Sequence, residues 1–280
     1  MMRAAEFVWV ERWAYLTKTR KIEDPQRTEV YEKVYAYYDT GDRFYHNFDH
    51  IEEMVVLLSQ QKWGPGQTFS MWQTVFAAFM HDAYDPKHPD AERLSADLAE
   101  EVFANIPVVL HSTEYDAFIR NVRNMILCTA NHQAETVAEH RLVDADLMRF
   151  CVGPWEKWAQ QIREEYNEHS DEKFDAGRKI VLERFFSRRP FYSMHTEGLD
   201  DFKAYTNIKA QLAELEPTPV KPMVPLSVAI SVDEDKVDQT KNWIGTMAPK
   251  IVTIRMGDGS TKQVWRVPLR EEFLIQGDFV

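Results

Sequence analysis

The sequence predicts a mainly α-helical protein that carries a small β-containing extension at its C-terminal end. Apolar residues recur at helical spacing from the start of the chain to about residue 216, and this periodicity is the first observation behind the prediction. The second is a stretch at 217–225 that holds four prolines and cannot continue a helix. The third is a glycine-containing turn at 257–260 between two segments typical of strands.

Amphipathic spacing predicts the helices of the body in order. The apolar residues of 7–16 and of 31–38 mark the first two helices, and the second stops near Gly41. A third helix is expected at 48–60. The segment 71–80 is apolar on nearly all sides, so we expect a central helix that its neighbours bury. Further helices are expected from about Asp90 and at 112–132, 155–168, 172–187 and 197–216.

The chain is accordingly expected to divide into a helical body at 1–216, a proline-rich linker at 217–225 and a β-containing extension at 226–280. Within the extension, 226–232 is typical of a strand. The segments 251–256 and 263–267 flank Gly257-Asp258-Gly259-Ser260, which predicts a β-hairpin. A chain of 280 residues with 44% hydrophobic residues is long and apolar enough for one large domain with such an appendage.

The composition argues against several classes of protein. The net charge of −12 and the isoelectric point near 5.3 disfavour an extended nucleic-acid surface, because neutralising phosphates requires clustered Lys and Arg. A small anionic substrate is compatible with this charge, since a divalent metal and a few arginines can reverse the sign inside one pocket. Cys128 and Cys151 are too isolated for a disulfide framework or a thiolate zinc site.

The sequence contains no signal for a membrane or for secretion. No stretch approaches the ~20 apolar residues that a membrane helix requires. The first ten residues lack the apolar run and the cleavage site of a signal peptide. We therefore expect a soluble, cytoplasmic protein with no membrane partner, and a homo-oligomer is compatible with the sequence.

Histidine and aspartate gather in four short segments of the body. Their imidazole and carboxylate groups suit Mn²⁺, Fe²⁺, Co²⁺, Ni²⁺ or Zn²⁺ better than Ca²⁺. When such residues end different buried helices, they can converge on one point, and an ion there would polarise a phosphoryl oxygen and lower the pKa of its water. Each segment alone also has a structural explanation, such as helix capping. The segments are Tyr45-His46-Asn47-Phe48-Asp49-His50-Ile51, His81-Asp82-Ala83-Tyr84-Asp85, Thr129-Ala130-Asn131-His132 and Asp144-Ala145-Asp146-Leu147.

Taken together, these segments resemble the HD superfamily of metal-dependent phosphohydrolases, and within it a bacterial and phage branch of hydrolases. The resemblance covers roughly residues 41–207 and implies an HD-type helical bundle. Nothing in 217–280 matches it. Besides the four segments, it rests on Glu92, Ser95-Ala96, Ile162-Arg163-Glu164-Glu165-Tyr166, Gly177-Arg178, Tyr192, Glu197 and Asn207.

The resemblance also implies a set of metal ligands. His50 would be the first ligand, His81 and Asp82 the second and third, and Asp146 the fourth, with Asp144 as the competing candidate for the last position. Such a site typically holds one ion and leaves positions open for water and phosphate. The cofactor expected is a divalent metal: Mn, Fe, Co, Ni, Zn or Mg.

A two-metal centre is an alternative, because some HD proteins add two histidines between the His-Asp pair and the last aspartate. His111 and His132 fall in that interval. His132 matches the motif of the branch, and it could equally face the substrate. His111 matches nothing in the family pattern and is more typical of a surface histidine near the start of a helix.

Further residues are candidates for catalysis and substrate binding. A proton for the leaving oxygen could come from Glu92, His46 or His132. Arg163 and Arg178 are candidates for binding phosphate, because a guanidinium group pairs two phosphate oxygens at once. The candidate set is thus His81, Asp82, Glu92 and His132 for catalysis, and His46, Arg163, Tyr166 and Arg178 for substrate binding.

The function expected is hydrolysis of a phosphate ester or anhydride by metal-activated water. By analogy with much of the superfamily, the small phosphorylated substrate would be a nucleotide, and nucleotidase, triphosphohydrolase and phosphodiesterase activities are all open. The first rival is an HD-type di-iron oxygenase, which would require His111 and His132 as further ligands. The second is a nucleotide-binding sensor without catalysis, whose C-terminal extension would bind a partner.

Overall fold

The computed structural model describes residues 3–19, 24–192, 196–215, 250–255 and 261–266. The chain divides into two compact units, Met1–Pro217 and Thr218–Val280. The boundary falls at the start of the proline-rich stretch. The expected linker at 217–225 lies outside the described residues, as do the expected strand at 226–232 and the expected turn at 257–260.

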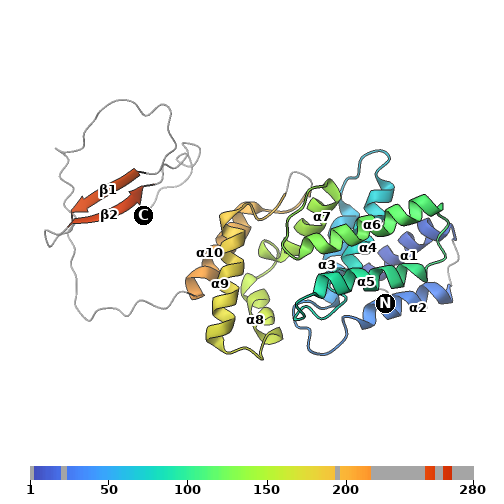
Figure 1. Cartoon of the computed structure of the whole chain (residues 1–280), viewed down its shortest axis with the longest axis horizontal. Coiled ribbons are helices and arrows are strands. Elements are labelled where there is room, and N and C mark those ends of the chain that lie inside the picture. Colours follow the sequence, from blue (N-terminus) through green and yellow to red (C-terminus); the bar gives the residue numbers. More distant parts are fainter. Residues whose placement is uncertain (1–2, 20–23, 193–195, 216–249, 256–260, 267–280) are drawn as a thin grey trace. The chain divides into compact units, whose positions relative to one another are not determined.

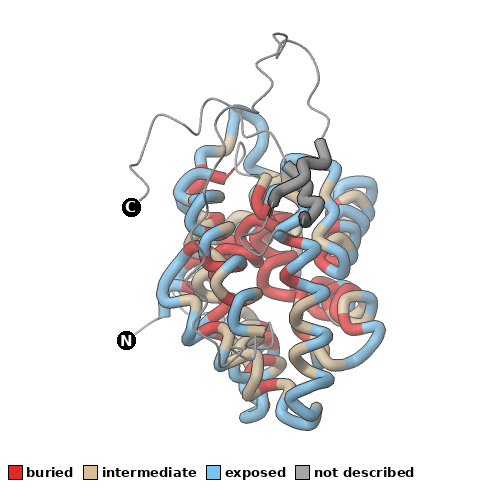
Figure 2. The backbone as a smooth tube through the Cα atoms, turned by 90° about the vertical axis from the view of Figure 1, so that its left-hand side faces the viewer, coloured by how far each residue is buried: buried red, intermediate tan, exposed pale blue. Residues whose placement is uncertain are grey.

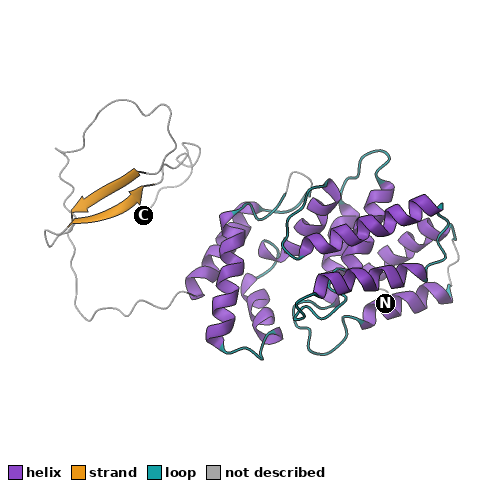
Figure 3. Cartoon of the chain, in the orientation of Figure 1, coloured by secondary structure: helices purple, strands orange, loops and turns teal. Residues whose placement is uncertain are grey.

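The described part of the first unit is helical (Figures 1 and 3). This confirms the mainly α-helical class for the body. Its elements are α1 Ala4–Thr17, α2 Pro25–Ala36, α3 Phe48–Gln60, α4 Thr68–Met80, α5 Ala91–Ala104, α6 Ser112–Thr129, α7 Val137–Asp146, the 3₁₀ turn η1 Leu147–Phe150, α8 Trp155–Glu165, α9 Asp171–Ser187 and α10 Asp201–Leu215.

Helix α4 runs through the middle of the unit, as its all-round apolar sequence predicts. Every residue from Trp72 to Met80 is buried, and α3, α5, α6 and α7 pack around it. Tyr38 anchors its last turn by donating a hydrogen bond of 2.8 Å from its hydroxyl to the carbonyl of Phe79. None of the described helices, α4 included, is long and apolar enough to cross a membrane.

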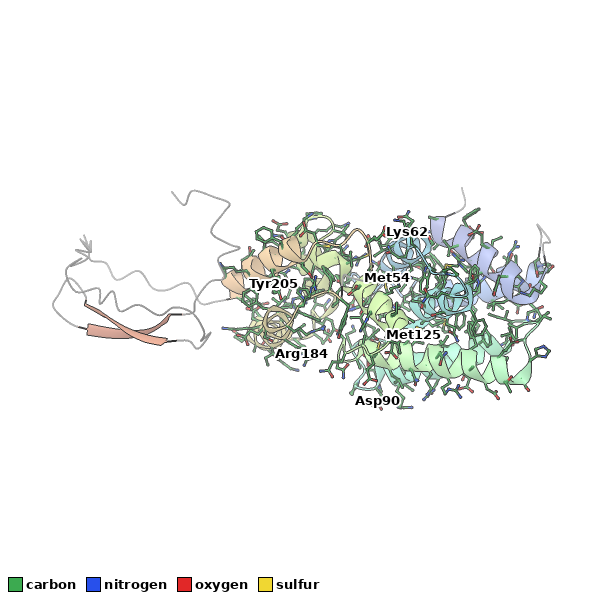
Figure 4. The ribbon with its side chains drawn as sticks, turned by 90° about the horizontal axis from the view of Figure 1, so that it is seen from above. Met54, Lys62, Asp90, Met125, Arg184 and Tyr205 are labelled. Carbon is green, nitrogen blue, oxygen red and sulfur yellow. The ribbon has the colours of Figure 1, made fainter. Side chains whose placement is uncertain are left out.

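The buried side chains form two cores. Figure 2 shows the buried residues in the interior, surrounded by exposed ones. The larger core joins α1 to α7, and the smaller joins the end of α7 and η1 to α9 and α10. Met54 and Met125 lie in the larger core, whereas Arg184 and Tyr205 lie on α9 and α10 at the other side of the unit (Figure 4). The two cores meet at α7, which places its C-terminal end between them.

Helix α7 is the one described helix that the hydrophobic pattern did not predict. It begins with a capping box: Thr136 Oγ1 accepts a hydrogen bond from the backbone N–H of Glu139, and the Glu139 carboxylate accepts one of 2.9 Å from the N–H of Thr136. The spacing Thr136-Val137-Ala138-Glu139 is the signal that could have predicted this start. The helix matters because it carries both aspartates of the fourth motif.

Two helix ends differ from the boundaries that the sequence predicts. Helix α6 ends at Thr129, so His132 lies in the following turn with a φ of 54° instead of closing the helix. Helix α8 ends at Glu165, and 166–170 form a turn before α9. His132 and Tyr166 therefore lie in turns and not within helices.

In the second unit, the described residues form two antiparallel strands, β1 Lys250–Arg255 and β2 Thr261–Arg266. Lys250 pairs with Arg266, and Arg255 pairs with Thr261. These strands lie within one residue or two of those that the sequence predicts. The wider β-containing extension at 226–280 stays a prediction, since most of it lies outside the described residues.

We expect Thr136→Ala to destabilise the first unit, because the N–H of Glu139 would lose its capping acceptor. A lost N-cap of this type costs about 1 kcal/mol, which lowers Tm by a few degrees in a domain of this size. Thermal unfolding followed by circular dichroism would measure it. Thr113→Ala is the matched control, because Thr113 is exposed in the first turn of α6. Equal melting temperatures for the two variants would contradict the capping role.

Candidate metal centre

Four side chains from three helix ends converge at one point: His50, His81, Asp82 and Asp146. Each offers one ligand atom, and these atoms all lie within 4.8 Å of one another. His50 is on the first turn of α3, His81 and Asp82 follow the last turn of α4, and Asp146 ends α7. The structure thus brings together the four residues that the resemblance implied as ligands.

Local sequence fixes these helix ends. Asn47 caps α3 by accepting a hydrogen bond from the backbone N–H of His50 at 3.2 Å, so His50 lies one turn into the helix. The apolar run of α4 stops at Met80, and the chain leaves the core with His81 and Asp82 side by side. The C-terminal ends of α4 and α7 carry partial negative charge, which favours a cation between them.

The distances within the cluster are those of ligands around a common ion. His50 Nε2 lies 3.1 Å from Asp146 Oδ1, and His81 Nε2 lies 3.5 Å from the same oxygen and 3.0 Å from Asp82 Oδ2. Two atoms about 2.1 Å from one ion are about 3.0 Å apart at a right angle and about 3.4 Å apart at the tetrahedral angle. These three distances therefore fit ligands of one divalent ion.

Two of the atoms that face the centre have no hydrogen-bond partner. Nδ1 of His81 lies 3.0 Å from the carbonyl oxygen of Ala78, to which it donates, so the lone pair of Nε2 points into the cluster. Although His81 Nε2 and Asp82 Oδ2 are 3.0 Å apart, neither is aligned to hydrogen-bond with the other, and both are buried. Buried polar atoms without partners are costly, and a bound cation would satisfy both.

The charge of the cluster also calls for a cation. Burial alone would raise the pKa of Asp146, but hydrogen bonds from His132 and His50, together with the nearby imidazole of His81, bring its pKa well below the ordinary range. The pKa of Asp82 is likewise lowered, because the imidazoles of His81 and His46 outweigh its burial. Burial would lower the pKa of His81, yet these two carboxylates, 15% and 12% exposed, raise it well above its ordinary value. A divalent ion would take the place of the imidazole proton and balance the same negative charges.

Asp144 and Asp146 point to opposite sides of α7, which decides between the two candidates for the last ligand. Residues two apart on a helix differ by roughly 200° in direction. Asp146 faces the cluster, whereas Asp144 Oδ1 accepts a hydrogen bond of 2.6 Å from the backbone N–H of Tyr192 on the other side. Burial raises the pKa of Asp144 to about 6. Asp144 therefore holds the segment before α10 and does not face the cluster.

His132 joins the centre from the turn after α6. Its Nε2 lies 3.1 Å from Asp146 Oδ2, the oxygen that the other two imidazoles leave free, and its ring packs edge-on against Phe185. A positive φ is uncommon for a residue with a side chain, and this one directs the imidazole back across the turn. His132 thus touches a ligand of the cluster and faces the adjoining cavity.

His111 is placed far from the centre, which corrects the ligand set of the two-metal alternative. It is exposed and precedes α6, while His132 follows the other end of that helix. The 18 residues of α6 span about 27 Å, so the two histidines cannot bind the same metal pair. The backbone N–H of His111 bonds to the Glu114 carboxylate, as expected for a residue at a helix start.

A cavity of about 420 Å³ opens beside the cluster, between the first part of the unit and helices α8 and α9. Asp82, Asp146 and His132 line one part of it. The substrate candidates His46, Tyr166 and Arg178 also line it, as does Glu92 from the first turn of α5. Aromatic and aliphatic side chains cover much of the remaining wall: Phe150, Ile162, Phe174, Val181 and Phe185.

Arg163 differs from its predicted place, because it does not line this cavity. Its guanidinium group donates to Asp171 at 2.6 Å and to the backbone carbonyls of Tyr166 and His169 at 3.1 Å. These bonds close the turn between α8 and α9. The predicted phosphate contact of Arg163 therefore finds no support in its position, since its donors already have partners.

Three further residues support the centre, and the sequence alone assigned none of them a role there. Glu165, fully buried at the end of α8, accepts hydrogen bonds from the backbone N–H groups of Tyr45 and His46 and from the His46 ring. Arg43 donates to the backbone carbonyls of Asp82 and Ala83. Arg149, almost fully buried, joins Glu53 to the carbonyl of Tyr45. Polar residues with such long-range partners carry no periodic signal in sequence.

Comparison with known proteins does not assign the chain to a family. The chain matches no protein-family model, and a search of curated proteins found no match.

Asp146→Asn should abolish tight binding of a divalent ion, because the amide removes the charge of the oxygen that two imidazoles share. Metal content of purified protein and titration with Mn²⁺ or Zn²⁺ would measure the loss. Asp144→Asn is the matched control two residues away, and we expect it to bind metal like the wild type. Equal metal binding by Asp146→Asn and the wild type would show that the cluster is not the metal site.

Proposed function

We propose that this protein is a metal-dependent phosphohydrolase that acts on a small phosphorylated molecule. The proposal is supported by one arrangement above all: the two aspartates of a cluster that could hold a divalent ion share one cavity with an arginine that pairs with no carboxylate of the described residues. The resemblance of the motifs to the HD superfamily points the same way. The proposed site residues are those that line the cavity or form the cluster.

The position of Arg178 supports phosphate as the group that binds in the cavity. It lies on α9, lines the cavity and donates a hydrogen bond of 2.8 Å to the neutral side chain of Gln211. No carboxylate of the described residues comes within ion-pair distance of it, and burial lowers its pKa. A desolvated guanidinium gains strongly from an anion that it can bind through two hydrogen bonds. A phosphate group is such an anion.

The chemistry proposed divides between the ion and the side chains. When bound, a divalent ion would polarise a phosphoryl oxygen and make water a nucleophile near neutral pH. His50, His81, Asp82 and Asp146 would hold the ion. Arg178 would bind oxygens of the phosphate and orient it toward the cluster.

The side chains that line the cavity beside the cluster would transfer the protons of the reaction. His132 is directed there by its bond to Asp146, and Glu92 and His46 line the same space. Each can exchange a proton with the attacking water or the leaving oxygen if the substrate comes within hydrogen-bond reach. The apolar wall would exclude bulk water and strengthen these contacts.

The cavity favours a substrate of small-molecule size with an apolar or aromatic part. Its volume lies within the range of small-molecule sites, and rings of Phe150, Phe174 and Tyr166 could stack on a base or another flat group. A nucleotide has both the phosphate and the ring, and it is the substrate class we propose. The di-iron alternative is not supported, since His111 is remote from the cluster.

Purified protein loaded with Mn²⁺ should release phosphate or a nucleoside from some member of a panel of nucleotides and aryl phosphates. Chelation with EDTA should abolish the release, and Mn²⁺ should restore it. Asp82→Ala should lower kcat at least about 100-fold, because the metal and its nucleophile would be lost. Asp90→Asn, an exposed aspartate before α5, is the control. Unchanged turnover in Asp82→Ala would refute the proposed site.

Arg178→Gln should weaken substrate binding more than it slows the chemical step, because the guanidinium binds phosphate in both the ground state and the transition state. We expect KM to rise about 10- to 100-fold, which corresponds to the loss of a charge-assisted hydrogen bond. Steady-state kinetics with the best substrate of the panel would measure this. Arg184→Gln, exposed on the same helix, is the control. An unchanged KM would contradict the phosphate role.

A further inference from the structure

Glu165 is a buried carboxylate that the proposed chemistry leaves unexplained. Its side chain is fully shielded from solvent and lies at the C-terminal end of α8, where the helix dipole disfavours negative charge. Burial by itself would raise its pKa, yet hydrogen bonds with His46 and with two backbone N–H groups lower it. Burying an ionised carboxylate in this place costs desolvation free energy, which its hydrogen bonds have to offset.

The bonds of Glu165 are divided between its two oxygens. Oε2 accepts hydrogen bonds from the backbone N–H groups of Tyr45 at 2.8 Å and His46 at 3.0 Å. Oε1 accepts one from Nδ1 of the His46 ring. The carboxylate therefore fixes both the backbone and the ring of His46, across 119 residues of sequence. A carboxylate that caps only the backbone would not need the ring contact.

The ring of His46 lies beside the metal cluster without belonging to it. Its centroid is 6.4 Å from that of His50, and it lines the cavity together with Asp82. Its side chain is 22% exposed, and no described residue bonds to its Nε2. Because Nδ1 is held by Glu165, Nε2 is the atom left to meet a molecule in the cavity.

We propose that Glu165 is a positioning residue that orients His46, so that Nε2–H of the His46 imidazolium donates a hydrogen bond to the reacting phosphate group of the substrate. This inference rests on the proposed function and deepens it. Glu165 acts only through His46 and touches neither metal nor substrate. A carboxylate that holds one imidazole nitrogen fixes the direction of the other, as in other carboxylate–histidine pairs of active sites.

A double-mutant cycle separates this role from a merely structural one. Glu165→Gln should lower kcat about 10-fold and His46→Gln about 10- to 100-fold, with the metal content of both unchanged. In the His46→Gln background, Glu165→Gln should then lower kcat no further, because its only route to the substrate is already gone. Rates would be measured with Mn²⁺ on p-nitrophenyl phosphate and on the best nucleotide of the panel.

A structural role predicts the opposite pattern. If Glu165 served only to cap the backbone at 45–46, the two substitutions would multiply in kcat, and that result would overturn the proposal. An unchanged kcat in Glu165→Gln would overturn it as well. Glu164→Gln is the control, because Glu164 accepts its hydrogen bond from Gln160 on the same helix. Melting temperatures would verify that each variant is folded.

A second measurement does not depend on turnover. The hydrogen bond between Glu165 and Nδ1 of His46 should give a strongly downfield imidazole proton signal in NMR spectra of the metal-loaded protein, lost in both single variants and kept in Glu164→Gln. Absence of this signal in the wild type would overturn the positioning role. A wild type that shows the signal but hydrolyses nothing in the panel would instead refute the proposed function and, with it, the substrate contact.

Discussion

Two ionised carboxylates held close together inside the protein are the constraint on which the rest of the site depends. Asp82 and Asp146 come from different helices, and their mutual repulsion has to be balanced where they meet. Three imidazoles share the two oxygens of Asp146, which is the densest set of contacts in the cluster. A divalent ion would complete this balance, which neutral side chains at the two aspartate positions would not require.

The helical framework holds these charges in place because packing, not the charges, sets the positions of the helix ends. Helix α4 is buried along its length, and its C-terminal end delivers His81 and Asp82 together. Helix α7 is shared between two cores: Leu142 and Ala145 pack in the larger, Val143 and Leu147 in the smaller. The cluster lies where the two cores meet. A movement of one core relative to the other would therefore change the distances within the cluster.

The division into two cores also separates the tasks of the site. The helices of the larger core carry the metal-ligand candidates, while α8 and α9 supply Arg178, Tyr166 and most of the apolar wall of the cavity. Glu165, at the end of α8, connects the two parts through His46. In the proposed function, positive charge from Arg178 and a divalent ion would let a chain with a net charge of −12 bind a phosphate.

Sequence by itself determined the helical class, most helix positions, the break near Pro217 and the four residues of the cluster, because helix periodicity and short motifs are local signals. Tertiary structure alone decided between Asp144 and Asp146, since the choice depends on which side of α7 faces the centre and α7 itself lacked a clear apolar stripe. It also removed His111 from the centre and Arg163 from the cavity, and it revealed Glu165. Contacts between residues distant in sequence depend on how helices pack, and that information is not local to any motif.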